Sequence, residues 1–313
     1  MRAALAALVG VLLAACGPPS FPLPGRDAHV VVVVPHPDDD VLGAGDLLAA
    51  LARAGTPATV VYVTSGDGYH EAAGLDPDMC PTTPWMLRGL GRRREDEVRL
   101  ATSRLGLRAD QLRFLGFPDG GLSILWSTHW ATPWLSPHTA VDRVPYADAV
   151  APGAPYTGAS LVDVLGRTLV ALRPTLVVTA DPLDDHPDHA ATGWFTVAAL
   201  RRSGLDPDLL FFVVHDPCWP PAAAEWSPTP APPAARFPDT RWIAFAPTPA
   251  ERAAETSALD AYRSQLAVMP GTLYRFLGPR EVFGAVDAAA LARMVPAPGT
   301  LPPPHGRVVC GPP

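Results

Sequence analysis

The chain has 313 residues, of which 48% are apolar, and a formal net charge of −7. This length and apolar content are enough for one large domain with a sizeable core, whereas an acidic chain is poorly suited to binding the phosphate backbone of a nucleic acid. All 24 basic residues are arginine, which excludes an enzyme that forms a Schiff base through a lysine.

The first residues have the pattern of an export signal. Arg2 precedes a run of small and apolar residues at 3–15, shorter than the roughly 20 residues of a membrane-spanning helix. Leu13-Ala14-Ala15-Cys16 resembles the bacterial lipobox, in which the cysteine is lipidated and becomes the mature N-terminus. We therefore expect a lipoprotein signal peptide at 1–15 and, at 16–28, lipidated Cys16 with a flexible tether. Such a protein is exported and anchored to a membrane of the bacterial cell envelope, on its periplasmic or outer surface. An ordinary signal peptide with an accidental cysteine is the alternative.

Three further cysteines, Cys80, Cys218 and Cys310, form no Cys-x-x-Cys pair, so a thiolate zinc site is not indicated. In an exported protein they can be oxidised. Three cysteines allow at most one intrachain disulfide, and the sequence leaves its pairing open.

Short apolar runs alternate with segments of helical spacing along the chain. Strands are predicted at 30–35, 59–64, 111–115, 175–180 and 209–215, with 241–246 as a candidate for one more. Helices are predicted at 41–54, 92–105, 160–172, 189–202 and 249–266. This alternation is typical of an α/β fold with a Rossmann-like, mainly parallel sheet and helices on both faces. We expect a single domain at 29–295 with long loop insertions, followed by an irregular C-terminal tail at 296–313.

Two acidic histidine clusters follow two of the predicted strands. His36-Pro37-Asp38-Asp39-Asp40 comes after five valines, and His186-Pro187-Asp188-His189 comes after the apolar run at 176–180. Ligands of open α/β sheets bind at the carboxyl ends of the strands. The clusters are therefore expected to contribute to one site.

The clusters offer the ligands of a catalytic metal ion. A catalytic zinc site typically has three protein ligands from His and Asp or Glu, with water in the open position. His36, Asp39 and His189 form such a set. The ion would lower the pKa of the water toward about 7 and make it a nucleophile.

The remaining residues of the clusters have groups for proton transfer. Asp38 is placed to take the proton of the water. His186 could stabilise the oxyanion and protonate the leaving amine, with Asp188 or Asp185 able to orient it. The sequence therefore predicts a hydrolytic metal site.

Three alternatives remain open. Acidic residues after a strand are common N-caps, so Asp39 or Asp40 could simply cap the next helix. Two histidines and one carboxylate also suit the Fe(II) of a non-haem oxygenase, although those sites usually lie on β-barrels. The third is a catalytically degenerate lipoprotein that binds sugar or metal without turnover. A serine hydrolase is not indicated, because the sequence has no Gly-x-Ser-x-Gly elbow.

The motifs, taken in order, resemble those of the PIG-L/LmbE-like N-deacetylases. The two clusters are similar to the family's Pro-His-Pro-Asp-Asp-Glu and His-Pro-Asp-His. Further similar segments are the glycine loop at 64–68, the Arg/Glu helix at 94–106, Leu-Gly-Phe-Pro-Asp-Gly-Gly-Leu at 115–122, and Tyr-Arg-Ser-Gln at 262–265. The chain departs from the family at Asp40 and Asp67, which replace glutamates, and at Tyr262, where histidine is common.

The resemblance implies a divalent metal, usually zinc, with Fe2+ or Co2+ as alternatives. It also implies removal of an acetyl group from an N-acetylglucosamine-type amide on a glycan, glycolipid or other glycoconjugate. Carried over, His36, Asp39 and His189 would be the ligands. Asp38 would be the base and His186 the electrophilic and acid partner, with Asp188 behind it. Arg94 and Asp119 match positions that hold substrate in some members. The expected partner is thus a small-molecule or glycan substrate, and no protein partner is inferred.

The segment between Asp119 and Tyr156 has little regular pattern but contains Trp126, Trp130 and Trp134. Long irregular loops in compact domains are often functional. Tryptophan faces can stack on sugar rings, so Trp126 and Trp130 are candidate substrate contacts. With a spacing of four they could instead pack on the core from one helix.

Overall fold

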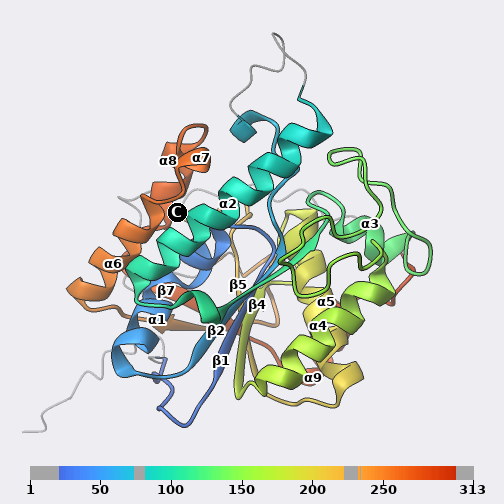
Figure 1. Cartoon of the computed structure of the whole chain (residues 1–313). Helices are drawn as coiled ribbons and strands as arrows, with labels where there is room; N and C mark the ends of the chain where they lie inside the picture. The colour runs from blue at the N-terminus through green and yellow to red at the C-terminus, as the bar shows by residue number, and fades with distance from the viewer. Residues whose placement is uncertain (1–20, 74–81, 222–231, 233, 301–313) are drawn as a thin grey trace, which may run out of the picture.

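The computed structural model describes residues 21–73, 82–221, 232 and 234–300. Within them, one seven-stranded sheet is covered by helices on both faces (Figure 1). The strand order is β3-β2-β1-β4-β5-β7-β6. The predicted single α/β domain with a mainly parallel sheet is confirmed.

Five strands pair in parallel: β1 (Val30–Val34), β2 (Ala58–Thr64), β3 (Leu112–Phe117), β4 (Leu176–Ala180) and β5 (Asp208–Phe212). They confirm the five predicted strands. The candidate strand is also present as β6 (Arg241–Phe245), and it pairs antiparallel with β7 (Glu281–Ala285). Strand β7, which the sequence analysis missed, also joins β5 in antiparallel sense.

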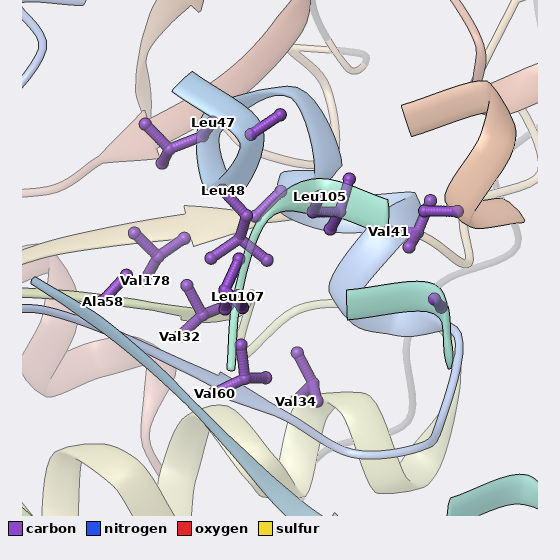
Figure 2. Close-up of a cluster of buried hydrophobic side chains, with 14 of the residues drawn as sticks. Val32, Val34, Val41, Leu47, Leu48, Ala58, Val60, Leu105, Leu107 and Val178 are labelled. Carbon is purple, nitrogen blue, oxygen red and sulfur yellow. The ribbon is translucent and has the colours of Figure 1, made fainter. Parts of the chain in front are cut away.

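The five valines of β1 show why the sheet is buried on both faces. Val30, Val32 and Val34 belong to one core cluster, and Val31 and Val33 belong to the other. Side chains of a strand alternate between the two faces, so a continuous apolar run requires helices on both. Figure 2 shows Val32 and Val34 of β1 beneath Leu47 and Leu48 of the helix that follows.

Three helices contribute to each core. The cluster with Val32 contains residues of α1 (Asp39–Ala54), α2 (Pro84–Leu105) and α6 (Pro249–Leu259). The cluster with Val31 contains residues of α3 (Leu122–Ser127), α4 (Gly158–Leu172) and α5 (Pro187–Ser203). The remaining helical elements are η1 (Glu71–Ala73), η2 (Ala109–Gln111), α7 (Arg263–Leu266), α8 (Pro270–Leu273), η4 (Tyr274–Phe276) and α9 (Ala288–Met294).

Two helices differ from their predicted bounds. Helix α2 begins at Pro84 rather than residue 92, because Thr83 caps it by accepting a hydrogen bond from the Met86 amide at 3.3 Å. The helix predicted at 249–266 is two helices, α6 and α7. They are separated at 260–262, where the Tyr262 side chain is fully buried.

Helix α1 is broken at Ala44, which has φ −157° and ψ 23°. The break frees the amides of Asp46 and Leu47, which donate hydrogen bonds of 2.6 and 2.8 Å to the two carboxylate oxygens of Glu281. A residue of β7 thus caps the second half of α1.

No helix in the described part of the chain combines the length and apolar character needed to cross a bilayer. The predicted signal peptide and Cys16 lie outside the described residues, as do Cys80, Cys310 and positions 301–313 of the tail. Residues 296–300 form neither helix nor strand. Cys218 is disulfide-bonded.

Candidate active site

The acidic histidine clusters meet at the carboxyl edge of the sheet. His36 follows β1, and His186 and His189 lie at the start of α5, directly after the loop that leaves β4. Strands β1 and β4 are neighbours at the point where the strand order reverses. This is the position where open α/β sheets bind ligands.

Two of the predicted ligands, His36 and His189, each place a ring nitrogen near one carboxylate oxygen of the third, Asp39. Asp39 Oδ2 lies 3.1 Å from His36 Nδ1 and 3.2 Å from His189 Nε2. Ligand atoms at about 2.0–2.1 Å from a tetrahedral zinc ion lie about 3.3 Å from one another. These separations therefore fit a shared ion.

The other ring nitrogen of each histidine faces a second carboxylate. His36 Nε2 lies 3.2 Å from Asp119 Oδ1 and 3.4 Å from Asp188 Oδ2. His189 Nδ1 lies 3.6 Å from Asp184 Oδ2. Metal-ligating histidines almost always have such an outer partner, which fixes the ring and its tautomer.

The site attracts positive charge. Burial lowers the pKa of His36, but the charge of Asp119 and hydrogen bonds to carboxylates raise it well above its usual value. Burial likewise opposes the charges of Asp39 and Asp184, which raise the pKa of His189 to about 9. Neither ring nitrogen of His189 has a hydrogen-bond partner among the described residues. A fully buried imidazole between carboxylates, with neither nitrogen hydrogen-bonded, has the donor set that a cation would need.

Asp38 is held in an unusual backbone conformation, with φ at 113°. Such a conformation costs about 1–3 kcal/mol in a residue other than glycine. Arg94 compensates by donating to Pro37 O at 2.5 Å and to Asp38 Oδ1 at 3.2 Å. Burial raises the pKa of Asp38 to about 7 against the opposing charge of Arg94.

Position 66 has no space for a residue larger than glycine, because the Arg94 guanidinium lies against it. Its guanidinium also donates to Gly66 O at 3.1 Å. A Cβ on Gly66, which has φ +67°, would lie 2.2 Å from Arg94 Nη1. The glycine loop therefore allows Arg94 to reach the loop that carries Asp38.

The acidic residues of the first cluster do not act as side-chain caps. Asp38 occupies the N-cap position of α1 without a side-chain capping bond. Asp39 Oδ2 accepts from the His36 amide at 3.0 Å, which lies before the helix. Asp40 accepts from two tyrosine hydroxyls, Tyr62 at 2.8 Å and Tyr262 at 2.5 Å. The capping alternative therefore describes none of the three side chains.

Two of the departures from the family motifs contact each other. Asp40 stands in place of glutamate and Tyr262 in place of histidine, and both are fully buried. Their hydrogen bond links the first turn of α1 to the residue before α7. Asp40, which is shorter than glutamate, is thus reached by the hydroxyl of Tyr262, which is longer than histidine.

In the described part of the chain, the His186 ring forms no hydrogen bond with the carboxylate of Asp188 or Asp185, the two residues expected to orient it. The Asp188 carboxylate accepts from the amides of Gly120 at 2.7 Å and Leu122 at 2.9 Å. His186 is the N-cap of α5 and its Nδ1 accepts from the Asp188 amide at 3.2 Å. The other candidate, Asp185, forms an ion pair with Arg236.

Two residues of the site were missed in the sequence. His215 follows β5, and its ring centroid lies 4.6 Å from that of His189 and 4.9 Å from that of His186. Asp184 accepts from the amides of Val214 at 2.9 Å and His215 at 3.1 Å, and it also faces His189. His215 could have been found by its position at the carboxyl end of a strand, as for the two clusters, because it ends the predicted strand 209–215.

A cavity of about 380 Å³ opens over the cluster. Its walls include His36, Asp38, Asp39 and His186, together with Arg94 and Asp119, the two candidate substrate contacts. The tryptophans lie elsewhere. Trp126 is fully buried in the core with its ring 5.0 Å from Phe195, and Trp130 packs against it at 5.6 Å. Neither lines the cavity, so packing on the core is the interpretation that fits, although α3 ends before Trp130.

Comparison with known proteins gives a consistent result. A deacetylase of 1D-myo-inositol 2-acetamido-2-deoxy-alpha-D-glucopyranoside from Kineococcus radiotolerans is 30% identical over 186 residues, covering 57% of this chain and 46% of that protein. The similarly named deacetylase from Streptomyces avermitilis is 27% identical over 283 residues, covering 88% of this chain and 83% of that protein. The chain spans about half the length of several of these curated relatives. These homologues are deacetylases of N-acetylglucosamine-type substrates.

Solved structures share the fold. A conserved protein of Thermus thermophilus matches with a TM-score of 0.50 and 25% identity, covering 82% of this chain and 94% of that one. An A40926 pseudoaglycone deacetylase matches with a TM-score of 0.54 and 22% identity, covering 83% and 97%. The family model for PIG-L, the GlcNAc-PI de-N-acetylase, matches residues 31–200, which is more than half of the chain. The protein therefore belongs to the PIG-L family.

Proposed function

We propose that the chain is a divalent-metal-dependent hydrolase that removes the acetyl group from an N-acetylglucosamine-type amide. One observation carries the metal: His36 and His189 each direct one ring nitrogen to Asp39 and the other to a further carboxylate. This is the arrangement of metal-ligating histidines and their outer partners. The family and its deacetylase relatives support the amide substrate. The α/β fold disfavours the oxygenase alternative.

His36, Asp39 and His189 would hold the ion, and His215 lies close enough to Asp39 and His189 to be a further ligand. Imidazole and carboxylate together suit zinc, Fe2+ and Co2+. A related fold has been solved as a zinc-inhibited form of teicoplanin deacetylase, so zinc is one metal to compare with others. When bound, the ion supplies a nucleophilic water at neutral pH and polarises the amide carbonyl.

The side chains then move one proton in two steps. Asp38 lines the cavity and takes the proton of the attacking water. Burial lowers the pKa of His186 to about 3. Since its Nδ1 accepts a backbone hydrogen bond, neutral His186 carries its proton on Nε2 and can donate to the developing oxyanion. Protonated Asp38 then returns the proton to the leaving amine, so a free amine and acetic acid result, and the acid releases its own proton to solvent as acetate.

The proposal for the location of the protein rests on the sequence of residues 1–16 alone. Lipidated Cys16 would hold the enzyme at the cell envelope, where its substrate would be a glycan, glycolipid or other glycoconjugate. Mass measurement of Cys16 in the mature protein tests this part independently of activity. A mature N-terminus without lipid would exclude the anchor.

The decisive experiment is acetate release from N-acetylglucosamine conjugates by the full chain loaded with Zn2+, Co2+ or Fe2+. Asp38→Ala should lower the rate by about 10²–10⁴-fold at unchanged metal content, and His189→Ala should lower metal content as well. Asp185→Ala is the matched control, because Asp185 adjoins His186 but pairs with Arg236 outside the cavity. Binding without acetate release by every metal form would favour the binding-only alternative.

A further inference from the structure

The cavity over the cluster has two unlike walls. The wall formed by the cluster is polar and charged, whereas the rest of the lining is mainly apolar, with Tyr69, His138, Gln265 and Thr272 as its polar members. The apolar side chains are Leu42, Val214, Met269, Leu273 and Phe276. Each wall needs a different chemistry in the molecule that fills the cavity.

The apolar wall begins at the reactive groups. Leu42 lies on α1 one turn after Asp38 and Asp39, so the three side chains share one side of the helix. Val214 directly precedes His215. A substrate whose amide reaches the cluster is therefore in contact with apolar surface at once, and the same molecule must fill both parts.

The wall continues outward on the C-terminal elements. Leu273 of α8 is only 1% exposed and holds this segment on the core. Met269, before α8, and Phe276 of η4 are half-buried and present their remaining surface to the cavity. The outer, more accessible part of the cavity thus has a large apolar surface, with exposed Thr272 beside it, and this is where the group attached to the sugar extends toward solvent.

This lining does not suit a polyol. In the relatives from Kineococcus and Streptomyces the group attached to the sugar is myo-inositol. Hydroxyls placed against Met269 and Phe276 would lose their water without gaining partners, which is unfavourable. An alkyl or aryl group would instead bury its own surface there.

We infer that the substrate is an N-acetylglucosamine-type amide whose aglycone is apolar, and that Met269 and Phe276 determine this specificity. The inference rests on the proposed deacetylase activity and adds the class of the aglycone. It concerns the aglycone rather than the N-acyl group, because the carbonyl of the acyl group must lie at the buried cluster.

The test compares the full metal-loaded chain on a matched series of N-acetylglucosaminides. The aglycones are methyl, butyl, hexyl, phenyl and myo-inositol, all used below micelle-forming concentrations. Each methylene that becomes buried should raise kcat/KM about fourfold. We expect the hexyl and phenyl glycosides to exceed the methyl and inositol glycosides by at least about tenfold.

Variants assign the effect to the wall. Met269→Ala and Phe276→Ala should each reduce the hexyl-to-methyl ratio of kcat/KM. Val268→Ala and Tyr274→Ala are controls, since these neighbours are 37% and 42% exposed and do not line the cavity. Leu273 is avoided because its truncation would damage the core.

The outcomes separate the two proposals. Equal rates for all aglycones, or a preference for inositol, would overturn the apolar aglycone and leave the deacetylase intact. A gain from lengthening the N-acyl chain instead of the aglycone would also overturn it. No acetate from any glycoside in any metal form would remove the deacetylase and this inference together.

Discussion

Removing the Tyr262 hydroxyl tests whether Asp40 is a buried anion held by two phenols. The hydroxyls of Tyr62 and Tyr262 lie 2.8 and 2.5 Å from its two oxygens, and all three residues are fully buried. Tyr262→Phe keeps the ring in place and deletes one donor. The carboxylate then keeps a single side-chain donor at a site that water does not reach.

The expected cost depends on the charge of Asp40. Burial raises the pKa of Asp40 to about 6, while the two tyrosine hydrogen bonds lower it. Because the pKa of Asp40 is higher in the folded than in the unfolded protein, its contribution to folding stability decreases as pH rises from about 4 through 6. At pH 8 the carboxylate is ionised, and the lost bond should cost about 1.5–3 kcal/mol. At pH 5 it is protonated in both proteins, and the cost should fall to about 0.5–1.5 kcal/mol.

Urea unfolding followed by tryptophan fluorescence at pH 5 and pH 8 measures this difference. Tyr274→Phe is the matched control, because that hydroxyl donates to Asp260 at 2.6 Å on an exposed surface. In the Asp40→Asn background the effect of Tyr262→Phe should lose its pH dependence. If Tyr262→Phe costs no more than the control at both pH values, the buried ionic link does not exist.

Three further predictions concern other buried charges. Arg94→Lys keeps the charge, but a lysine cannot reach Asp38, Pro37 and Gly66 together, so the pKa of Asp38 should rise. The value of kcat/KM should then fall more at pH 6 than at pH 8, by about tenfold at pH 6. An unchanged pH profile would contradict this role of Arg94. Asp184→Asn should weaken metal binding by about 10–100-fold, measured by competition with a chromophoric chelator. Asp181→Asn is the control and should not weaken it, because Asp181 is a buried neighbour that accepts a hydrogen bond from the Leu183 amide. Equal effects of the two variants would reject the role of Asp184 as the outer partner of His189. Burial and the charges of Glu281 and Asp46 raise the pKa of Glu255, although the charge of Arg252 lowers it, so the protein loses stability as pH rises. Glu255→Gln, which mimics the protonated acid, should therefore be more stable than the wild type by about 1 kcal/mol or more at pH 9, with a smaller difference at pH 5. A variant less stable than the wild type at pH 9 would refute this.

The parallel strands could be predicted because each is a local pattern. Val30–Val34 has to be buried on both faces wherever it lies, and this alone indicates a covered sheet. Strand β7, which lies between β5 and β6, has no such pattern. It contains Glu281 and Gly284, and its existence depends on pairing with β6, which lies earlier in the chain and meets it in the register Arg241↔Ala285. A Cβ on Gly284 would lie 2.6 Å from Thr240 Cγ2, so this glycine is required by a contact that only the folded chain shows.

The site shows the same division. His36, Asp39 and His189 could be chosen because residue type, spacing and position after a strand all pointed to a ligand. The sequence could not tell whether a nearby aspartate would contact the His186 ring. The direction of an aspartate side chain at a helix N-terminus depends on which backbone amides it meets. Asp188 meets those of Gly120 and Leu122, which come from a loop 66 residues or more away in sequence.

The break in α1 has a consequence for how the chain can be divided. A fragment ending at residue 200, where the family match stops, would retain His36, Asp39 and His189. It would lack Glu281, and the amides of Asp46 and Leu47 would be left without their acceptor in the middle of the helix that follows the ligands. Each unpaired buried amide costs about 1–3 kcal/mol. The boundaries of the recognisable family region are therefore not the boundaries of a cooperative folding unit, and expression of that region alone should yield a chain that cannot hold its own catalytic helix.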